Sequence, residues 1–226
     1  MKTIPTLLTL DKFELMDQLE LFQPYFDRIQ IDVADGVLVP NVTTQIDELL
    51  EVISQGHFEI SSKTTFDFHL MVKNYKAELI KIADLQKQNV NVRTVLINAS
   101  LRPKLNELSR EYNFAIGLDV SPEQEIEAIA DHYDLSLVPS IQIMTVNPGF
   151  QGSPFLPKML MKIQQLRDHD YSGEILIDGG VNSTTIPVIK SQKYRPSILC
   201  IGSYLTKAGD ELESRINELR NLEEKK

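Results

Sequence analysis

The feature that most constrains the fold is an alternation of short apolar segments with longer amphipathic segments, repeated along the whole chain. The apolar segments predict strands over residues 3–9, 28–33, 65–70, 92–97, 114–118, 140–145, 174–177 and 198–201. The segments after them predict helices over residues 12–22, 44–53, 75–88, 103–111, 121–130, 154–167, 184–191 and 210–222. Strand–helix alternation is typical of parallel sheets, and eight repeats favour a closed α/β barrel, the (β/α)8 TIM barrel. An open, doubly wound sheet remains the alternative, since periodicity does not show closure.

Composition agrees with one soluble barrel domain spanning residues 1–226. Hydrophobic residues make up 42% of the chain and the formal net charge is −9, so we expect no nucleic-acid partner and no anionic membrane partner. The single cysteine, Cys200, lies in a predicted core strand and suits a reducing compartment. The apolar run near the start contains Pro5 and ends at Asp11, and no segment reaches the roughly 18 apolar residues of a membrane span. These features predict a cytoplasmic protein.

The segment 141–156 combines a buried strand, a glycine-containing loop and a predicted helix start. Gly149 and Gly152 leave loop amides open to a ligand, and Ser153 and Pro154 suit the N-cap and first position of a helix. Exposed amides beside a helix N-terminus favour binding of an anion. An ordinary strand–helix turn that contains two glycines and binds no ligand would have the same sequence pattern.

Two further glycine loops strengthen the prediction of an anion site. Gly179-Gly180 follows the seventh predicted strand and Gly202-Ser203 follows the eighth. Loops after the last strands of this fold commonly bind phosphate. We therefore expect a phosphorylated ligand.

Polar residues at strand ends mark a candidate active site, because the catalytic groups of barrels lie at the carboxyl ends of the strands. Asp32, with Gln30 on the same side of its strand, His69 and Asp178 are the candidates, and Met71 and Met144 lie near the same rim. Asp32 and Asp178 come from well-separated strands and could face the two sides of a ligand.

Each candidate also has a structural interpretation. Asp32 could accept hydrogen bonds from loop amides, His69 could be a buried structural histidine, and Asp178 could form a turn with Gly179. Asp35 fits a turn better than it fits catalysis.

Five motifs in this order resemble the ribulose-phosphate 3-epimerase family over nearly the whole chain. They are Ile-Asp-Val-Ala-Asp-Gly at 31–36 with Val-Pro-Asn at 39–41, Asp-Phe-His-Leu-Met-Val at 67–72, Met-Thr-Val-Asn-Pro-Gly-Phe at 144–150, Ile-Asp-Gly-Gly-Val at 177–181 and Ile-Gly-Ser at 201–203. The resemblance implies a ribulose-phosphate-binding barrel of pentose phosphate or related carbohydrate metabolism, with a small sugar phosphate as its partner and a homo-oligomer as a common state.

The resemblance also implies roles for individual residues. Asp32 and Asp178 would transfer protons and hold a divalent metal, and His69 would be a further metal ligand. Met71 and Met144 would cover the intermediate as an apolar cap. Thr9 stands where the family has a serine on its first strand.

The chain departs from the family around the metal. Gln30 stands where the family has a second histidine ligand, and an amide oxygen binds zinc more weakly than imidazole does. Zn, Mn, Mg and Fe are therefore all candidates, with Mg or Mn favoured relative to zinc and Gln30 as a weaker ligand. Leu96 and Asn98 replace a histidine and a glutamate, and Ala34 replaces a methionine.

The residues and the resemblance together predict a ketose-phosphate 3-epimerase acting on ribulose 5-phosphate and xylulose 5-phosphate, or on a related ketose phosphate. The alternative is a non-catalytic barrel that binds a sugar phosphate and has lost the full metal site. A decarboxylase of the related phosphate-binding barrels would need a lysine where Ala34 stands. Another aldose or ketose phosphate isomerisation is a further possibility.

Overall fold

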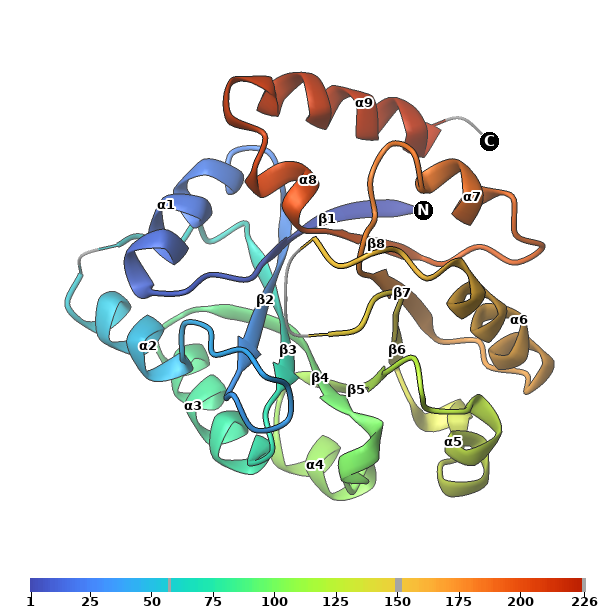
Figure 1. The fold of residues 1–226 in the computed structure, drawn as a ribbon. Helices are drawn as coiled ribbons and strands as arrows, with labels where there is room; N and C mark the ends of the chain where they lie inside the picture. The colour runs from blue at the N-terminus through green and yellow to red at the C-terminus, as the bar shows by residue number, and fades with distance from the viewer. Residues whose placement is uncertain (57, 149–151, 225–226) are drawn as a thin grey trace.

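The fold is a closed barrel of parallel strands in sequence order, enclosed by helices (Figure 1). The computed structural model describes residues 1–56, 58–148 and 152–224. The strands are β1 (Lys2–Leu7), β2 (Arg28–Ala34), β3 (Thr65–Met71), β4 (Asn91–Asn98), β5 (Ala115–Val120), β6 (Ser140–Met144), β7 (Glu174–Asp178) and β8 (Ile198–Ile201). Because β1 pairs with both β2 and β8, the predicted closed barrel is confirmed and the open sheet is excluded.

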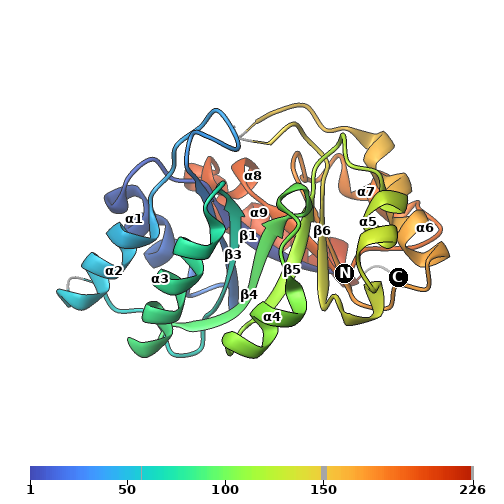
Figure 2. The same cartoon turned by 90° about the horizontal axis from the view of Figure 1, so that it is seen from below.

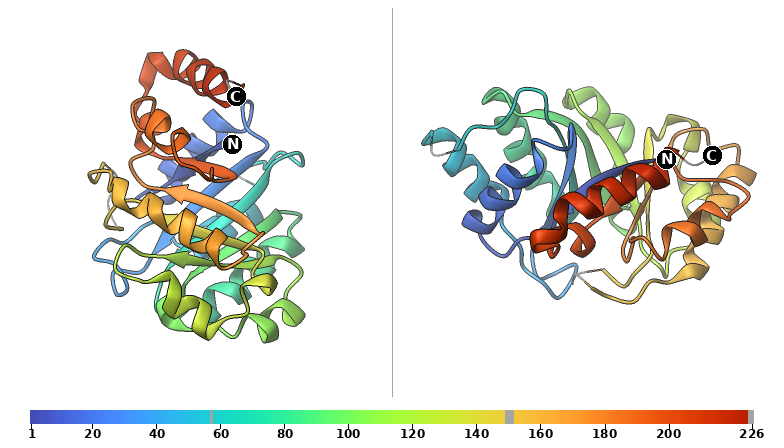
Figure 3. Two further views of the ribbon diagram at one scale, coloured as in Figure 1. Left: turned by 90° about the vertical axis from the view of Figure 1, so that its right-hand side faces the viewer. Right: turned by 90° about the horizontal axis from the view of Figure 1, so that it is seen from above.

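Helices surround the strands on the outside of the barrel (Figure 2). They are α1 (Lys12–Phe22), α2 (Ile46–Ser54), α3 (Tyr75–Lys87), α4 (Leu105–Glu111), α5 (Ile126–His132), α6 (Met161–Asp168), α7 (Ile186–Lys190), α8 (Ser203–Thr206) and α9 (Leu212–Glu224). The long α9 lies across β1 and covers it (Figure 3). None of the helices among the described residues combines the length and apolar character needed to cross a membrane.

Successive side chains of a strand point alternately toward the helices and toward the barrel axis, so the buried side chains form two layers. In β2, Ile29, Ile31 and Val33 belong to the large apolar core. The residues between them, which include Gln30 and Asp32, lie on the other side of the strand, because successive side chains point to opposite faces. β2 is thus apolar toward the helices and carries polar groups toward the barrel axis, where a smaller apolar cluster that includes Leu96 and Leu176 also lies.

Strand register brings the candidate residues to the same level. Asp32 pairs with His69 in the β2–β3 ladder, and Met144 pairs with Asp178 in the β6–β7 ladder. Asp178 in turn lies beside Cys200 on β8. A single ring of strands therefore gathers residues that are far apart in the sequence.

The strongest disagreement with the sequence-based prediction concerns the segment after β6. The predicted helix start at Pro154, with Ser153 as its N-cap, is wrong, because residues 152–156 are not helical. Leu156 N–H donates instead to Thr145 O (2.7 Å), which holds this segment against the end of the strand. A short 3-10 turn begins at Pro157 and leads into α6, so the helix after β6 does not begin beside Gly152 in the sequence.

Smaller differences concern element ends. The first strand ends at Leu7 instead of residue 9, and the last helix begins at Leu212 after a 3-10 turn. The short α8 was not predicted. The fifth strand extends to Val120, which places Asp119 inside the barrel wall instead of in a loop.

Candidate active site

A buried cluster of two carboxylates and one imidazole lies at the carboxyl ends of β2, β3 and β7. One ligand atom each of Asp32, His69 and Asp178 lies within 4.8 Å of the others. His69 Nδ1 is 3.3 Å from Asp32 Oδ1 and 3.7 Å from Asp178 Oδ2. The cluster is formed by side chains from three strands, so it exists only in the closed barrel.

Two buried glutamine amides support the carboxylates. Gln30 Nε2 donates to Asp32 Oδ1 and to Asp178 Oδ2, both at 3.2 Å. Gln142 Nε2 donates to Asp178 Oδ2 at 2.9 Å. The thiol of Cys200 lies on the other side of both amides, with Sγ 3.6 Å from Gln30 Oε1 and 3.8 Å from Gln142 Oε1. The thiol thereby favours the orientation in which both amides donate to the carboxylates.

Burial and crowding of negative charge shift the protonation of the cluster. Burial, with the nearby charge of Asp32, raises the pKa of Asp178 to about 8. Burial alone would lower the pKa of His69, but the carboxylates of Asp119 and Asp32 raise it well above its usual value. Three carboxylates thus surround one imidazole in a site shielded from water, and an added cation would relieve their repulsion.

The donor set of the cluster suits one divalent cation. A histidine nitrogen and two carboxylates are ligands used by Zn²⁺, Mn²⁺ and Fe²⁺. Asp32, His69 and Asp178 all bring a ligand atom to the same point. Gln30 does not fit its expected ligand role in this orientation, because its Nε2 group faces the carboxylates and its oxygen faces Cys200.

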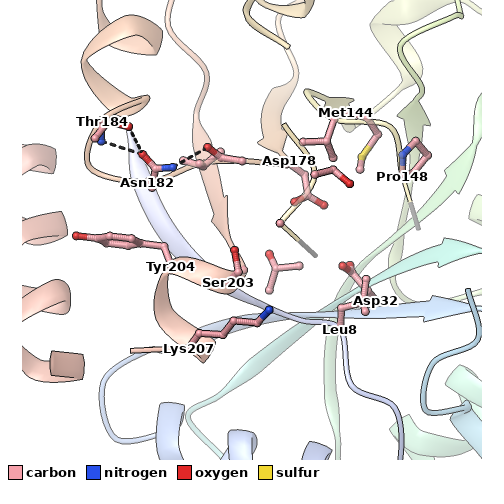
Figure 4. Close-up of a pocket in the computed structure, with 18 of the residues that line it drawn as sticks. Leu8, Asp32, Met144, Pro148, Asp178, Asn182, Thr184, Ser203, Tyr204 and Lys207 are labelled. Carbon is pink, nitrogen blue, oxygen red and sulfur yellow. Dashed lines mark hydrogen bonds between the residues drawn. The ribbon is translucent and has the colours of Figure 1, made fainter. Parts of the chain in front are cut away.

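A cavity of about 470 Å³ opens above the cluster. Asp32, Asp178 and Met144 line it (Figure 4). Met71 contributes a further apolar part of the wall. The two carboxylates therefore line a space of the size expected for a small ligand.

The far side of the cavity carries the features of a phosphate site. Gly179, Gly180, Gly202 and Ser203 line it there, next to the turn that Asn182 organises by accepting hydrogen bonds from the N–H groups of Thr184 and Thr185. The side chain of Lys207 reaches toward the same space (Figure 4). Backbone amides of glycine loops together with one ammonium group suit an anion.

One of the predicted ligand-binding residues does not take part in the described cavity, and another lies outside the described residues. Thr9 does not line it, because its hydroxyl is buried and lies 2.8 Å from that of Thr44. Gly149 falls outside the described residues, whereas Gly152 lines the cavity. Asp35 is confirmed as a turn residue, since its carboxylate accepts from the N–H groups of Val37 and Leu38.

Sequence reasoning missed several residues of the site, among them Thr6, Gln142, Lys207 and Asp119. Thr6 lines the cavity from β1, and its buried hydroxyl has no hydrogen-bond partner among the described residues. Lys207 lines the cavity from the loop after α8, and Gln142 supports Asp178. Asp119 lies 3.5 Å from His69 Nε2. A signal existed for Asp119, because its Leu-Asp-Val context repeats the Ile-Asp-Val context of Asp32.

Comparison with known proteins agrees with this geometry. A model of the ribulose-phosphate 3-epimerase family matches residues 2–205. The ribulose-phosphate 3-epimerase of Helicobacter pylori (strain ATCC 700392 / 26695) is 31% identical over 216 residues, which cover 93% of this chain and 93% of that protein. The enzyme of the same name from Bacillus subtilis (strain 168) is 31% identical over 200 residues, covering 83% of this chain and 85% of that protein.

Solved structures share the fold at low sequence identity. KGPDC from Streptococcus mutans in complex with D-R5P superposes with a TM-score of 0.65 and 10% identity, covering 98% of this chain and 96% of that one. The 3-hexulose-6-phosphate synthase of Salmonella typhimurium gives a TM-score of 0.63 and 12% identity, covering 98% of both chains. These two structures support the barrel alone.

Proposed function

The chain belongs to the ribulose-phosphate 3-epimerase family, and on this premise we propose that it inverts C3 of a ketose phosphate, with ribulose 5-phosphate and xylulose 5-phosphate as the substrate pair. Membership makes the protein a carbohydrate-phosphate epimerase. The observation that carries the specific proposal is the pair of buried carboxylates, Asp32 and Asp178, that line one cavity.

The two carboxylates divide the proton transfers between them. The hydrogen at C3 is weakly acidic because C2 is a carbonyl carbon, so a carboxylate on one face can remove it and a carboxylic acid on the opposite face can return a proton. In the metal-free protein, burial and the charge of Asp32 raise the pKa of Asp178 to about 8, which favours the protonated form that the acid role requires. In the reverse direction the roles of Asp32 and Asp178 exchange.

The remaining groups hold the carboxylates and the ligand. Gln30 and Gln142 donate to the carboxylates and keep them in place during proton transfer. Asp32, His69 and Asp178 would hold a divalent metal, whose charge when bound would stabilise the negative oxygens of the enediolate. Met71 and Met144 exclude water from the reacting carbons.

The phosphate would bind at the glycine side of the cavity. Gly179, Gly180 and Gly202 allow the backbone to approach the phosphate oxygens, and Lys207 offers the positive charge. With the phosphate held there, the carbon chain of the sugar extends toward Asp32 and Asp178.

Solvent deuterium exchange tests the proposal directly. Ribulose 5-phosphate is incubated in D₂O with metal-free protein and with protein loaded with Zn²⁺, Mn²⁺, Mg²⁺ or Fe²⁺, and deuterium at C3 is followed by NMR. The loaded wild-type protein is expected to incorporate deuterium. Asp32→Asn and Asp178→Asn are expected to lower the rate about 10²–10⁴-fold, the usual contribution of a positioned acid or base.

Asp35→Asn is the matched control, because Asp35 directly follows β2, three residues after Asp32, and its carboxylate accepts hydrogen bonds within a turn. It is expected to exchange at the wild-type rate. Tight binding of the sugar phosphate without exchange under any metal would contradict the epimerase and favour a non-catalytic binder. Exchange with a hexulose phosphate but not with ribulose 5-phosphate would keep the mechanism and change the substrate.

A further inference from the structure

We propose that Asp119 is a positioning residue that holds the ring proton of His69 on Nε2 and so leaves Nδ1 free as the metal-binding atom. The inference rests on the proposed metal-dependent epimerisation and adds a residue to it. Asp119 lies on β5, two strands away from His69 on β3.

The two nitrogens of His69 face different groups. Nδ1 lies 3.3 Å from Asp32 Oδ1 and 3.7 Å from Asp178 Oδ2, on the side of the cluster that suits a cation. Nε2 lies 3.5 Å from Asp119 Oδ2 and has no hydrogen-bond partner of standard geometry in the described part of the chain. A proton on Nε2 gives this buried nitrogen an acceptor, whereas an unprotonated Nε2 would face a carboxylate with its own lone pair.

The surroundings of Asp119 fix its carboxylate in place. The side chain is almost completely buried, with 1% of its surface exposed. Asn98 Nδ2 donates to Asp119 Oδ2 at 2.7 Å and also approaches Ser121 Oγ at 2.9 Å. Oδ1 of Asp119 has no hydrogen-bond partner among the described residues, so Asn98 satisfies only one of the two oxygens of this buried carboxylate.

Chemistry explains why the tautomer matters. A histidine binds a metal through an unprotonated nitrogen, and the group that accepts the proton of the other nitrogen selects which one is free. With the proton on Nε2, the lone pair of Nδ1 points at Asp32 and Asp178, an arrangement that a cation between the three groups stabilises. Asp119 therefore orients His69 and makes its ring a stronger donor without touching the ligand cavity.

Metal affinity measures this role apart from catalysis. Zn²⁺ and Mn²⁺ are titrated into the metal-free wild-type protein, Asp119→Asn and Asp119→Ala by calorimetry. Asn keeps an acceptor oxygen but loses the charge, so affinity is expected to fall about tenfold, and Ala is expected to lower it about 100-fold, in the range found for outer-shell partners. Asp67→Asn is the matched control, because Asp67 is equally buried but pairs with Arg28, and it is expected to keep wild-type affinity.

A second readout needs no variant of Asp119. In Zn²⁺-loaded wild-type protein, two-bond proton–nitrogen NMR of the histidine rings is expected to show the proton of His69 on Nε2, with His69→Gln identifying its signals. A proton on Nδ1, or unchanged metal affinity in both Asp119 variants, would overturn this inference while leaving the epimerase intact. A wild-type protein that binds no divalent ion would overturn the proposed metal dependence and this inference together.

Discussion

Replacing Gly179 by alanine tests whether the loop after β7 is shaped by close backbone packing. Gly179 has φ +111°, a value that residues with a side chain rarely adopt. An added Cβ would lie 2.5 Å from Val146 Cγ2 and 2.9 Å from the backbone nitrogen of Val146. The backbone atom cannot rotate away as a flexible side chain could, so either the loop or the end of β6 must shift.

The cost follows from two separate effects. Holding a residue with a side chain at such a φ costs about 1–3 kcal/mol, and forcing an extra methyl group into a packed site costs about 1–3 kcal/mol more. The free energy of unfolding should therefore fall by roughly 2–6 kcal/mol. For a chain of this size each kcal/mol corresponds to about 2–4 °C in Tm, so the expected decrease is roughly 5–20 °C.

Gly209→Ala separates the two effects. Gly209 has φ +53°, and a Cβ built there meets no atom within 4 Å. It should lose only about 1–2 kcal/mol, the cost of the left-handed conformation. Urea unfolding and thermal unfolding of both variants measure the difference, and equal losses at the two positions would refute the packing argument. Because Gly179 also lines the cavity, its variant should bind the sugar phosphate more weakly, whereas Gly209→Ala should bind it normally.

Three further predictions concern charged residues. Lys207→Gln should raise KM for the sugar phosphate about tenfold with little change in kcat, since Lys207 lines the cavity and is proposed to pair with the phosphate, and an unchanged KM would exclude this contact. Arg28→Met removes the ion-pair partner of the buried Asp67 and should cost about 3–5 kcal/mol in urea unfolding. The double variant Arg28→Met/Asp67→Asn should restore part of this loss, and a double variant no more stable than the single one would contradict the ion-pair explanation. Burial and Asp32 raise the pKa of Asp178 from 3.8 to about 8, so this group stabilises the metal-free protein at low pH and the stabilisation is lost as pH rises toward 8. The free energy of unfolding of the metal-free protein should therefore fall by at least about 1 kcal/mol between about pH 5 and pH 8. In Asp178→Asn the free energy of unfolding should fall less over the same range. Identical pH profiles for the two proteins would contradict the assignment of this effect to Asp178.

The sequence by itself determined the order of the strands and the strand ends that carry chemistry. Strands of a parallel sheet are mostly apolar, so carboxylates at their carboxyl ends, such as Asp32 and Asp178, stood out as candidates for chemistry. His69 could be placed with them because all strands of a barrel end on the same rim. The local order of apolar and polar residues was sufficient for these predictions, since hydrophobic periodicity is a property of residues that are close in the sequence.

Contacts between distant segments decided the rest. Residues 152–156 stay non-helical up to the 3-10 turn at Pro157, and Leu156 N–H donates to Thr145 O, a contact that the residues near Pro154 do not reveal. Register and side-chain orientation placed Thr6 in the cavity instead of Thr9.

Tertiary structure also decided the roles of two side chains in the site. Gln30 turns its amide nitrogen toward Asp32 and Asp178, because both carboxylates accept hydrogen bonds from it, and its oxygen then lies near the thiol of Cys200. Asp119 approaches His69 because β3 pairs with β4 and β4 pairs with β5, which brings the two side chains together inside the barrel. The protonation and orientation of a buried polar group depend on the few atoms around it, and in a barrel those atoms come from strands that the sequence keeps far apart.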